Sequence, residues 1–435
     1  MSNPTTTTNE VNPTPYWISE CGRATIYIGK CEELLYRMPT NLFHAIVTDP
    51  PYGLEFMGKD WDAPWKNDGK IETCDEGTDK SHPFRDGTQR VCYGNNKKRK
   101  VDARQRRADE MNDSVKAKYL CHNVEYVYDA LLYQEWFYSC AKAIFCAAKP
   151  GAHLLSFGGT RMYHRMCCAI EDSRFEIRDV IMWVYGTGFP KGCDISKAID
   201  KIAGVERGCK SFEQSNTWRK FEERTDRQST VPDDNPITDA AKQWNGWNTA
   251  LKPAYEPIIV ARKKPEGSVA NNILDHGCGA INIDSCRIEK ESWKAHGRYP
   301  SNLIHDDSIE VQQALPEDAC RFFYSPKANN TDRAHGSEVI HPTVKPLDLM
   351  CYLVRLVCAK GGTVLDPFMG SGSTGCACLA EGMYFVGIEQ SEEYAKIAVE
   401  RLQEMLGIHP IVKRLENGKR TVKDEPPPPR KLRKS

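Results

Sequence analysis

The stretch VLDPFMGSGSTG at residues 364–375 decides the fold class of this 435-residue chain. An apolar strand runs into a loop with three glycines, and a helical pattern follows. Glycines permit a tight turn and let a ligand approach the backbone closely. The segment Asp366-Pro367-Phe368 separates the strand from the glycines, which differs from the usual dinucleotide fingerprint. The stretch therefore predicts a strand, a ligand-binding loop and a helix.

The charges around this loop favour one kind of ligand. Asp366, at the end of the strand, would repel a pyrophosphate but suits a cationic amino group. The next strand ends at Glu389, which is spaced to accept hydrogen bonds from ribose hydroxyls. S-adenosylmethionine, a nucleoside that carries a cationic amino acid, satisfies both requirements. The alternative is a glycine loop that only joins a strand to a helix, and the spacing of Glu389 favours the ligand.

The segment TDPPYG at residues 48–53 is the second motif. Because Pro50 and Pro51 cannot continue a β-ladder, the apolar strand before them must end at Asp49. The Asp49 carboxylate and a proline carbonyl then form a rigid pair of acceptors for both hydrogens of an exocyclic amino group. The Tyr52 ring offers a stacking surface for a planar base. An ordinary Asp-Pro turn is the alternative, and the four matched residues make it the weaker one.

Strand and helix patterns alternate along most of the chain. The alternation predicts an α/β fold with a mostly parallel sheet. Residues 186–340 lose this alternation and are expected to form an irregular region inserted into the core, with an isolated short strand at 257–261. Elsewhere the expected strands are 24–29, 45–48, 153–157, 179–185, 363–366 and 384–389, and the expected helices are 32–38, 125–148, 161–172, 346–358 and 392–405.

Composition excludes several classes of protein. Hydrophobic residues make up 40% of the chain, which is enough for a core and excludes global disorder. The 59 basic and 59 acidic residues cancel, so net charge gives no hint of a nucleic-acid partner. No apolar run approaches the ~18 residues of a membrane span, and the N-terminus lacks the apolar part of a secretory signal. The 18 cysteines are scattered, so we expect buried thiols and no metal site.

Together the two motifs resemble those of the DNA amino-methyltransferases, the modification methylases that make N6-methyladenine or N4-methylcytosine. The Asp-Pro-Pro-Tyr motif comes first and the glycine loop last, which resembles the family's permuted β-type order. The segment HPTVKP at 341–346 resembles the family motif beside the methionine end of the cofactor. The resemblance covers roughly residues 24–57 and 121–405. It implies a Rossmann-like, seven-stranded S-adenosylmethionine-dependent methyltransferase sheet with an inserted irregular target-recognition region.

The resemblance also implies which residues act. A target adenine flips out of double-stranded DNA, Asp49 and the Pro50 carbonyl hold its amino group, and Tyr52 stacks on its ring. Phe368 would touch the sulfonium, with core packing as the alternative. The expected catalytic residues are Asp49, Pro50, Pro51 and Tyr52. The expected cofactor-binding residues are Asp366, Pro367, Phe368, Gly370, Ser371, Gly372, Glu389, His341, Thr343 and Lys345.

The same resemblance gives each segment a role. Trp183 is expected in the core, with the wall of the base pocket as the alternative, and Trp244, Trp247, Arg262 and Lys263 are among the residues that could contact DNA. The expected segments are a flexible tail at 1–23, the catalytic half of the core at 24–189 with a mobile charged insertion at 58–120, a target-recognition region at 190–340, the S-adenosylmethionine-binding half at 341–408 and a flexible basic, proline-rich tail at 409–435.

Several alternatives stay open at the level of sequence. Aspartate at position 49 resembles the adenine-N6 enzymes, whereas N4-cytosine enzymes more often carry serine there. RNA or a protein amide is a less favoured substrate, because amide methyltransferases usually carry asparagine before Pro-Pro-Tyr. A DNA-binding module without catalysis and a nucleotide-dependent oxidoreductase are the other classes. The expected setting is the cytoplasm of a bacterial or phage-infected cell, without a membrane, and a homodimer and a cognate restriction endonuclease remain open as partners.

Overall fold

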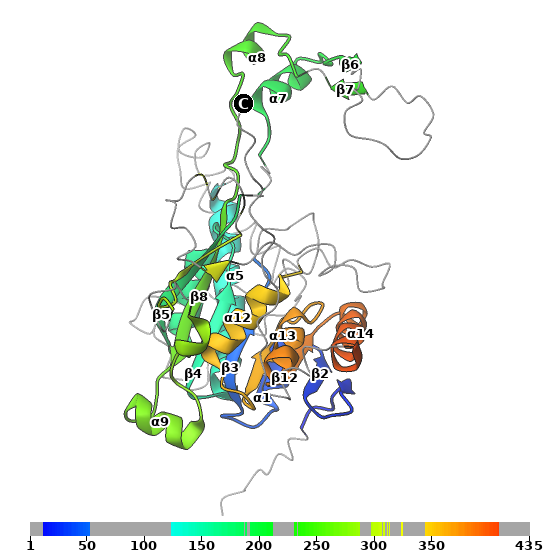
Figure 1. Ribbon diagram of the computed structural model, residues 1–435. Coiled ribbons are helices and arrows are strands. Elements are labelled where there is room, and N and C mark those ends of the chain that lie inside the picture. Colours follow the sequence, from blue (N-terminus) through cyan, green and yellow to red (C-terminus); the bar gives the residue numbers. More distant parts are fainter. Residues whose placement is uncertain are drawn as a thin grey trace, which may run out of the picture. The chain divides into compact units, whose positions relative to one another are not determined.

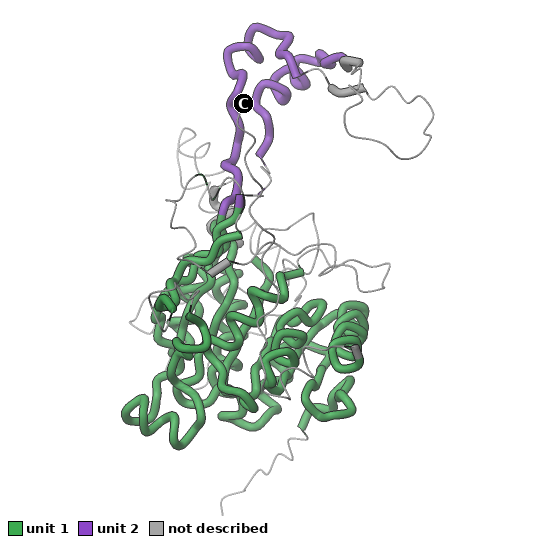
Figure 2. Tube along the Cα trace, viewed as in Figure 1, with its two compact units in different colours: residues 1–185, 255–435 green, residues 186–254 purple. Residues whose placement is uncertain are grey.

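The computed structural model describes residues 12–52, 123–186, 188, 192–211, 230–232, 234–287, 297–306, 308, 311, 313, 323–324 and 344–408. The chain divides into two compact units, one of residues 1–185 and 255–435 and the other of residues 186–254 (Figure 2). The expected insertion at 58–120 and the tail at 409–435 lie outside the described residues.

The first unit is built on one ten-stranded sheet, with the order β1-β2-β12-β11-β3-β4-β8-β5-β9-β10 (Figure 1). Neighbouring strands pair in parallel, except for β1 with β2 and for β8 with both β4 and β5. The mostly parallel α/β fold is therefore confirmed. The strands are β1 (Trp17–Ile18), β2 (Ala24–Ile28), β3 (Phe43–Thr48), β4 (Ala148–Phe157), β5 (Phe175–Val184), β8 (Tyr255–Lys263), β9 (Leu303–His305), β10 (Phe323–Tyr324), β11 (Thr363–Asp366) and β12 (Tyr384–Glu389).

The seven strands that the resemblance implies form the middle of this sheet, and the short strands β1, β9 and β10 extend its two edges. Strands as short as β1 and β10, with two residues each, leave no alternation in the sequence to detect.

Helices cover both faces of the sheet. Helices α1 (Cys31–Tyr36), α5 (Asn123–Ala147) and α6 (Tyr163–Asp172) pack on one face, and α12 (Leu347–Val357), α13 (Ser373–Glu381) and α14 (Glu392–Ile408) pack on the other (Figure 1). Strand β3 shows why both faces are apolar. Ala45 and Val47 join the core with α12, α13 and α14, whereas Ile46 joins the core with α1 and α5. Successive side chains of a strand point to opposite faces, so a strand covered on both sides needs apolar residues at every position.

Strand β8 corrects the predicted division of the chain. Residues 257–261 were expected to form an isolated strand within an inserted region at 190–340. Instead they lie in β8, between β4 and β5, and Ile258 to Ala261 are buried. The compact second unit ends at Ala254, and the later part of the expected region returns to the sheet through β8, β9 and β10. The glycine, proline and asparagine around β8 conceal this return in the sequence.

Strand β4 begins earlier than predicted. Pro150 and Gly151 were expected to precede the strand, but β4 includes both. The pairing of β4 with β3 shifts its register between Phe43 and Ala45. Such an irregularity accommodates a proline and a glycine with a positive φ of 78° inside a strand.

The second unit contains α7 (Ile195–Ile202), α8 (Asp239–Gln243) and a hairpin of β6 (Cys209–Ser211) and β7 (Thr230–Pro232). A buried carboxylate organises it. Asp200 accepts hydrogen bonds from the Arg207 side chain at 2.7 Å and from the backbone N–H groups of Ile237 and Thr238 at 3.1 and 3.0 Å. These contacts join α7 to the start of α8.

The remaining elements of the first unit are α9 (Val269–His276) and a short 3-10 helix at Asp284–Cys286. None of the described helices combines the length and the apolar character that crossing a membrane requires. The described cysteines are free thiols, and Cys31, Cys140, Cys376 and Cys378 are among those that are buried. Their burial agrees with the prediction of small core side chains.

The packing of α13 on the sheet gives a testable prediction. A Cβ atom at Gly375 would lie 2.7 Å from the Phe385 ring and 2.9 Å from Leu402 Cδ2, both buried. Gly375→Ala should therefore lower the free energy of unfolding by about 1–3 kcal/mol, measured by urea denaturation. Gly407→Ala is the matched control, because that helical glycine has open space around it and alanine should be neutral or stabilising by up to about 1 kcal/mol. Equal effects at both positions would contradict the packing described.

Candidate active site

The two motifs meet at the carboxyl ends of neighbouring strands. Strand β3 ends at Thr48, β11 ends at Asp366, and the two strands pair in parallel. The Thr48 hydroxyl donates a hydrogen bond of 2.7 Å to Asp366 Oδ1. Open α/β sheets bind ligands at this edge. Asp49 and the glycine loop therefore lie together at this edge of the sheet.

A pocket lies between these strand ends. Six residues singled out from the sequence line it: Asp49, Lys345, Asp366, Phe368, Gly370 and Ser371. Sequence reasoning missed four others, namely Met350, Met369, Ser373 and Thr374. Met350 comes from α12, which packs next to α13, and a methionine in a helix carries no sequence signal of its own.

The glycine loop is held in a fixed shape. Gly372 has φ of +80° and precedes α13, and a Cβ atom there would lie 3.0 Å from Ala398 Cβ. Glu389, at the end of β12, accepts a hydrogen bond of 3.0 Å from the Gly370 N–H. Arg401 donates to the Ser371 carbonyl oxygen at 2.7 Å. The loop is thus shaped by contacts within the protein.

Two carboxylates contact the loop, the buried Asp366 and the half-buried Glu389. Asp366 accepts hydrogen bonds from Thr48, from the Thr374 hydroxyl at 2.5 Å and from the Phe368 N–H at 3.1 Å. Burial outweighs these hydrogen bonds and raises the pKa of Asp366 to about 6. Burial also raises the pKa of Glu389. A ligand that brings positive charge or hydrogen-bond donors would stabilise the ionised form of both carboxyl groups.

Two aromatic residues had alternative interpretations. The Phe368 ring lines the pocket, and it also packs against Trp136 and Phe137 with centroid distances of 5.7 and 6.3 Å. Pocket contact and core packing therefore both apply to Phe368. Trp183 is 2% exposed and contacts Tyr185 edge to face, which agrees with a core position.

Asp49 lies in a network of charged and polar groups. Its Oδ2 atom is 2.6 Å from Lys345 Nζ, and its Oδ1 atom accepts a hydrogen bond of 2.7 Å from the Tyr52 hydroxyl. Lys345 Nζ also lies 3.3 Å from a Glu256 carboxylate oxygen. The remaining Glu256 oxygen accepts from the Tyr185 hydroxyl at 3.3 Å. One ammonium thus bridges two carboxylates at the edge of the pocket.

The ion pairs shift the titration of these groups. Burial raises the pKa of Asp49, and Lys345 opposes part of that rise. Burial by itself would lower the pKa of Lys345, but Asp49 and Glu256 raise it above its usual value. Lys345 is consequently an ammonium throughout the physiological range. Burial and the two carboxylates also raise the pKa of Tyr52 well above its usual value, so its hydroxyl stays protonated and can donate.

The remaining residues of the Asp-Pro-Pro-Tyr motif are fixed from outside the motif. The Tyr133 hydroxyl of α5 donates a hydrogen bond of 3.2 Å to the Pro51 carbonyl oxygen, and Pro50 is buried. Gly159 packs on Tyr52, because a Cβ atom at Gly159 would lie 3.1 Å from Tyr52 Cβ. The backbone turn and the tyrosine ring are thereby held in place.

Two predicted cofactor residues, His341 and Thr343, lie outside the described residues. Pro367 is buried beside the loop, and Lys345 lines the pocket but directs its ammonium to Asp49. Sequence reasoning also missed Glu256. It lies in the stretch ALKPAYEP at residues 250–257, near the start of β8.

Comparison with known proteins identifies the family. The N6/N4 DNA methylase family matches residues 43–400. This chain belongs to the N6/N4 DNA methylase family. The resemblance seen in the sequence is thereby confirmed, and so are DNA methylation as the activity and S-adenosylmethionine as the methyl donor.

Individual relatives are moderately similar. The type II methyltransferase M.HindIII of Haemophilus influenzae is 26% identical over 369 residues, which cover 84% of this chain and 91% of that protein. The type II methyltransferase M2.MboI of Moraxella bovis is 30% identical over 133 residues, which cover 30% of this chain and 46% of that protein. Among solved structures, the cytosine-N4-specific PvuII DNA methyltransferase is 14% identical, with a TM-score of 0.43 over 94% of this chain and 96% of its own.

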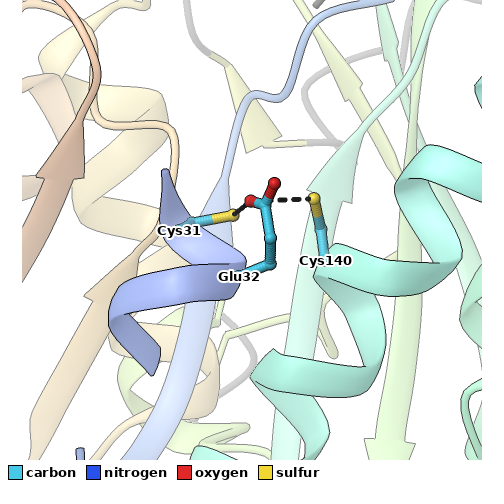
Figure 3. A group of neighbouring side chains, drawn as sticks. All are labelled: Cys31, Glu32 and Cys140. Atoms are coloured by element: carbon cyan, nitrogen blue, oxygen red, sulfur yellow. Dashed lines mark hydrogen bonds between the residues drawn. The ribbon is translucent and has the colours of Figure 1, made fainter. Parts of the chain in front are cut away.

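A separate group of metal-type ligands lies between α1 and α5. Cys31, Glu32 and Cys140 place their ligand atoms within 4.8 Å of one another (Figure 3). Both thiols donate to the same Glu32 oxygen, at 3.5 and 3.7 Å. Burial raises the pKa of both thiols, so each keeps its proton and can donate it to Glu32. The group therefore acts as a hydrogen-bonded contact between the two helices.

The packing of Gly159 on Tyr52 predicts how a methyl group added at residue 159 would affect catalysis. Gly159→Ala should displace the Tyr52 ring by a few tenths of an ångström. Because productive geometry is sensitive to such displacements, we expect DNA methylation to slow by roughly tenfold, measured as initial rates at saturating cofactor. Gly407→Ala, remote and in open space, should leave the rate unchanged. An unchanged rate in Gly159→Ala would show that the position of Tyr52 does not limit the reaction.

Proposed function

We propose that this DNA methylase transfers a methyl group from S-adenosylmethionine to the N6 amino group of an adenine that is flipped out of double-stranded DNA. The observation that carries the proposal is the Asp49 carboxylate, which lies at the end of β3 and lines the same pocket as the glycine loop after β11. This arrangement puts an acceptor for an amino group beside a pocket for a methyl donor.

The residues around the pocket fit S-adenosylmethionine chemically. Asp366 lines the pocket as a buried carboxylate whose pKa burial has raised to about 6, and it would attract the cofactor's ammonium. Glu389 would accept hydrogen bonds from the ribose hydroxyls. Phe368 presents an aromatic ring to the pocket and would favour the sulfonium. When bound, the cofactor supplies an electrophilic methyl group.

The Asp-Pro-Pro-Tyr motif would prepare the target amino group. Asp49 and the Pro50 carbonyl accept its two hydrogens, which directs the nitrogen lone pair toward the methyl group. Tyr52 stacks on the base. With the cofactor bound, the nitrogen would form a bond to the methyl carbon as the bond from sulfur to that carbon broke, and the electron pair of the broken bond would stay on sulfur. The nitrogen then gives up a proton to Asp49 or to solvent. Positioning and electrostatics supply the rate in such a site.

Adenine is the favoured base because the first residue of the motif is Asp49, which resembles the adenine-N6 enzymes. The first experiment combines the purified protein, S-adenosylmethionine and mixed-sequence duplex DNA, followed by digestion to nucleosides and mass spectrometry. N6-methyladenine is the expected product. N4-methylcytosine would overturn the assignment of adenine as the target base but would leave the assignment of the active-site residues unchanged.

The second compact unit, residues 186–254, is our candidate for target recognition. Trp244 and Trp247 are 40% and 60% exposed and contact each other edge to face, so they offer apolar surface to a base or a sugar. In contrast, Lys263 of the first unit donates to the carbonyl oxygens of Phe145 and Ala148 at 2.9 and 2.7 Å. That lysine is engaged in the fold, and we do not assign it to DNA.

Removing the Asp49 carboxylate should separate catalysis from cofactor binding. Asp49→Ala takes away the acceptor for the target amino group but leaves Asp366 and the glycine loop in place. We expect methylation to fall by at least about 10³-fold, while the dissociation constant for S-adenosylmethionine, measured by calorimetry, changes less than about threefold. Asp284→Ala is the control, because Asp284 is exposed and is not among the residues that line the pocket. Joint loss of cofactor binding and activity would instead assign Asp49 a structural role.

Cofactor affinity should depend on pH through Asp366. Its pKa is about 6 in the cofactor-free protein, and only the ionised carboxylate attracts an ammonium. As pH falls through 6, Asp366 takes up a proton and that attraction is lost. Affinity should therefore weaken by about tenfold between pH 7.5 and pH 5, measured by calorimetry. Asp366→Asn should bind more weakly at pH 7.5 and lose this dependence, and an unaltered dependence would assign it to another group.

A further inference from the structure

The Asp49 carboxylate is already occupied. Its two oxygens accept from Lys345 and from Tyr52, at 2.6 and 2.7 Å. An ammonium and an aromatic or exocyclic amino group are both N–H donors, so Lys345 Nζ stands where the amino group of a target base would bind Asp49. For the base to reach Asp49, this ammonium has to move or share the carboxylate.

A second carboxylate lies next to the same ammonium. Glu256 Oε2 is 3.3 Å from Lys345 Nζ, only 0.7 Å farther than Asp49 Oδ2. Glu256 sits near the start of β8, paired with Trp183 in the sheet. The Tyr185 hydroxyl donates to one of its oxygens at 3.3 Å, and the Tyr52 hydroxyl, whose proton goes to Asp49, lies 3.3 Å from the other. Glu256 is therefore a fixed acceptor that a small movement of the lysine would reach.

The surroundings of the ammonium suit such a movement. Lys345 Nζ lies 4.8 Å from the centre of the Phe157 ring and 5.6 Å from that of Tyr52. Ring faces attract a cation without fixing its direction, so the ammonium keeps favourable contacts while it exchanges one carboxylate for the other. The lysine side chain is 9% exposed, so water cannot readily replace a lost carboxylate.

The charges of Asp49, Lys345 and Glu256 also favour a role for Glu256 in the reaction. Asp49 and Lys345 alone sum to zero, and Glu256 makes the sum −1. During methyl transfer, positive charge moves from sulfur to the target nitrogen and remains there until a proton leaves. Three side chains with a summed charge of −1 stabilise that nitrogen more than a neutral pair does.

We propose that Glu256 is a positioning residue that takes the Lys345 ammonium away from Asp49 as the target amino group binds. This inference rests on the proposed transfer to an amino group of a flipped-out base. It adds to that proposal Glu256, a residue outside both sequence motifs, and it explains why a lysine lies between two carboxylates.

The test compares Glu256→Gln, Lys345→Gln and the double variant with the unaltered protein, at saturating cofactor and DNA. In Glu256→Gln the ammonium keeps Asp49 as its one charged partner among the described residues, so kcat should fall by at least about tenfold and KM for DNA should rise. The dissociation constant for S-adenosylmethionine should stay within about twofold. In the double variant the net charge returns to −1, so kcat should recover by at least about fivefold over Glu256→Gln.

This recovery is the decisive result, because the loss of two merely structural contacts would slow the double variant further. Melting temperatures of all variants identify any that fail to fold, and Glu256→Asp, which keeps the charge, should retain more activity than Glu256→Gln. The matched control is Glu176→Gln, which removes another glutamate paired with a cation, Arg262, at 3.1 Å on the same sheet. It should leave kcat unchanged.

Two results would overturn the inference. A Glu256→Gln protein with the kcat of the unaltered protein would show that Glu256 plays no part. A double variant no faster than Glu256→Gln would show that Glu256 does not act through Lys345. The outcome is separable from the base assignment, because an enzyme that makes N4-methylcytosine would fail the adenine proposal and still allow the same comparison of variants.

Discussion

The parallel pairing of β3 with β11 is the constraint on which the site depends. The two strands come from opposite ends of the chain, and their pairing brings Asp49 and Asp366 to the same edge of the sheet. The hydrogen bond from Thr48 to Asp366 joins the two strand ends directly. If this pairing were lost, the acceptor for the amino group and the loop for the methyl donor would become two unrelated turns.

The cost of this arrangement is electrostatic. Asp49, Asp366, Glu389 and Glu256 are carboxylates at or beside one edge of a sheet, and burial raises the pKa of the first three. Hydrogen bonds from Thr48, Thr374 and the loop backbone, together with the Lys345 ammonium, keep such a group of acids tolerable. The same carboxylates suit a reaction in which both the donor and the product nitrogen carry positive charge. Stability and activity therefore place opposing demands on this edge, as is common at functional sites.

Much of the fold could be predicted from the sequence where a short segment carries a clear pattern of residue types. Strands 363–366 and 384–389 have the predicted bounds, because each is an apolar run that ends in an acid before a turn. Strand β8 was predicted to be isolated, because its apolar run stands among residues typical of loops. Its position between β4 and β5 follows only from the pairing of the whole sheet. Helix α5 ends just before Pro150, close to the predicted bound, but Pro150 and Gly151 belong to β4, where the irregular pairing with β3 accommodates them. Glu256 was missed for a related reason, because its role depends on a strand whose neighbours are distant in the sequence.

The sequence by itself determined the two motifs, their order and hence the family, because a carboxylate before two prolines and a glycine loop after an acidic strand end are local patterns with a chemical meaning. It also determined the alternation of strands and helices that makes the sheet mostly parallel. Only the tertiary structure decided that the Lys345 ammonium contacts both Asp49 and Glu256. These three side chains come from separate segments, and the pairing of distant strands brings the ammonium within 3.3 Å of both carboxylates. A distance of that kind follows from the packing of the whole sheet, and no local pattern contains it.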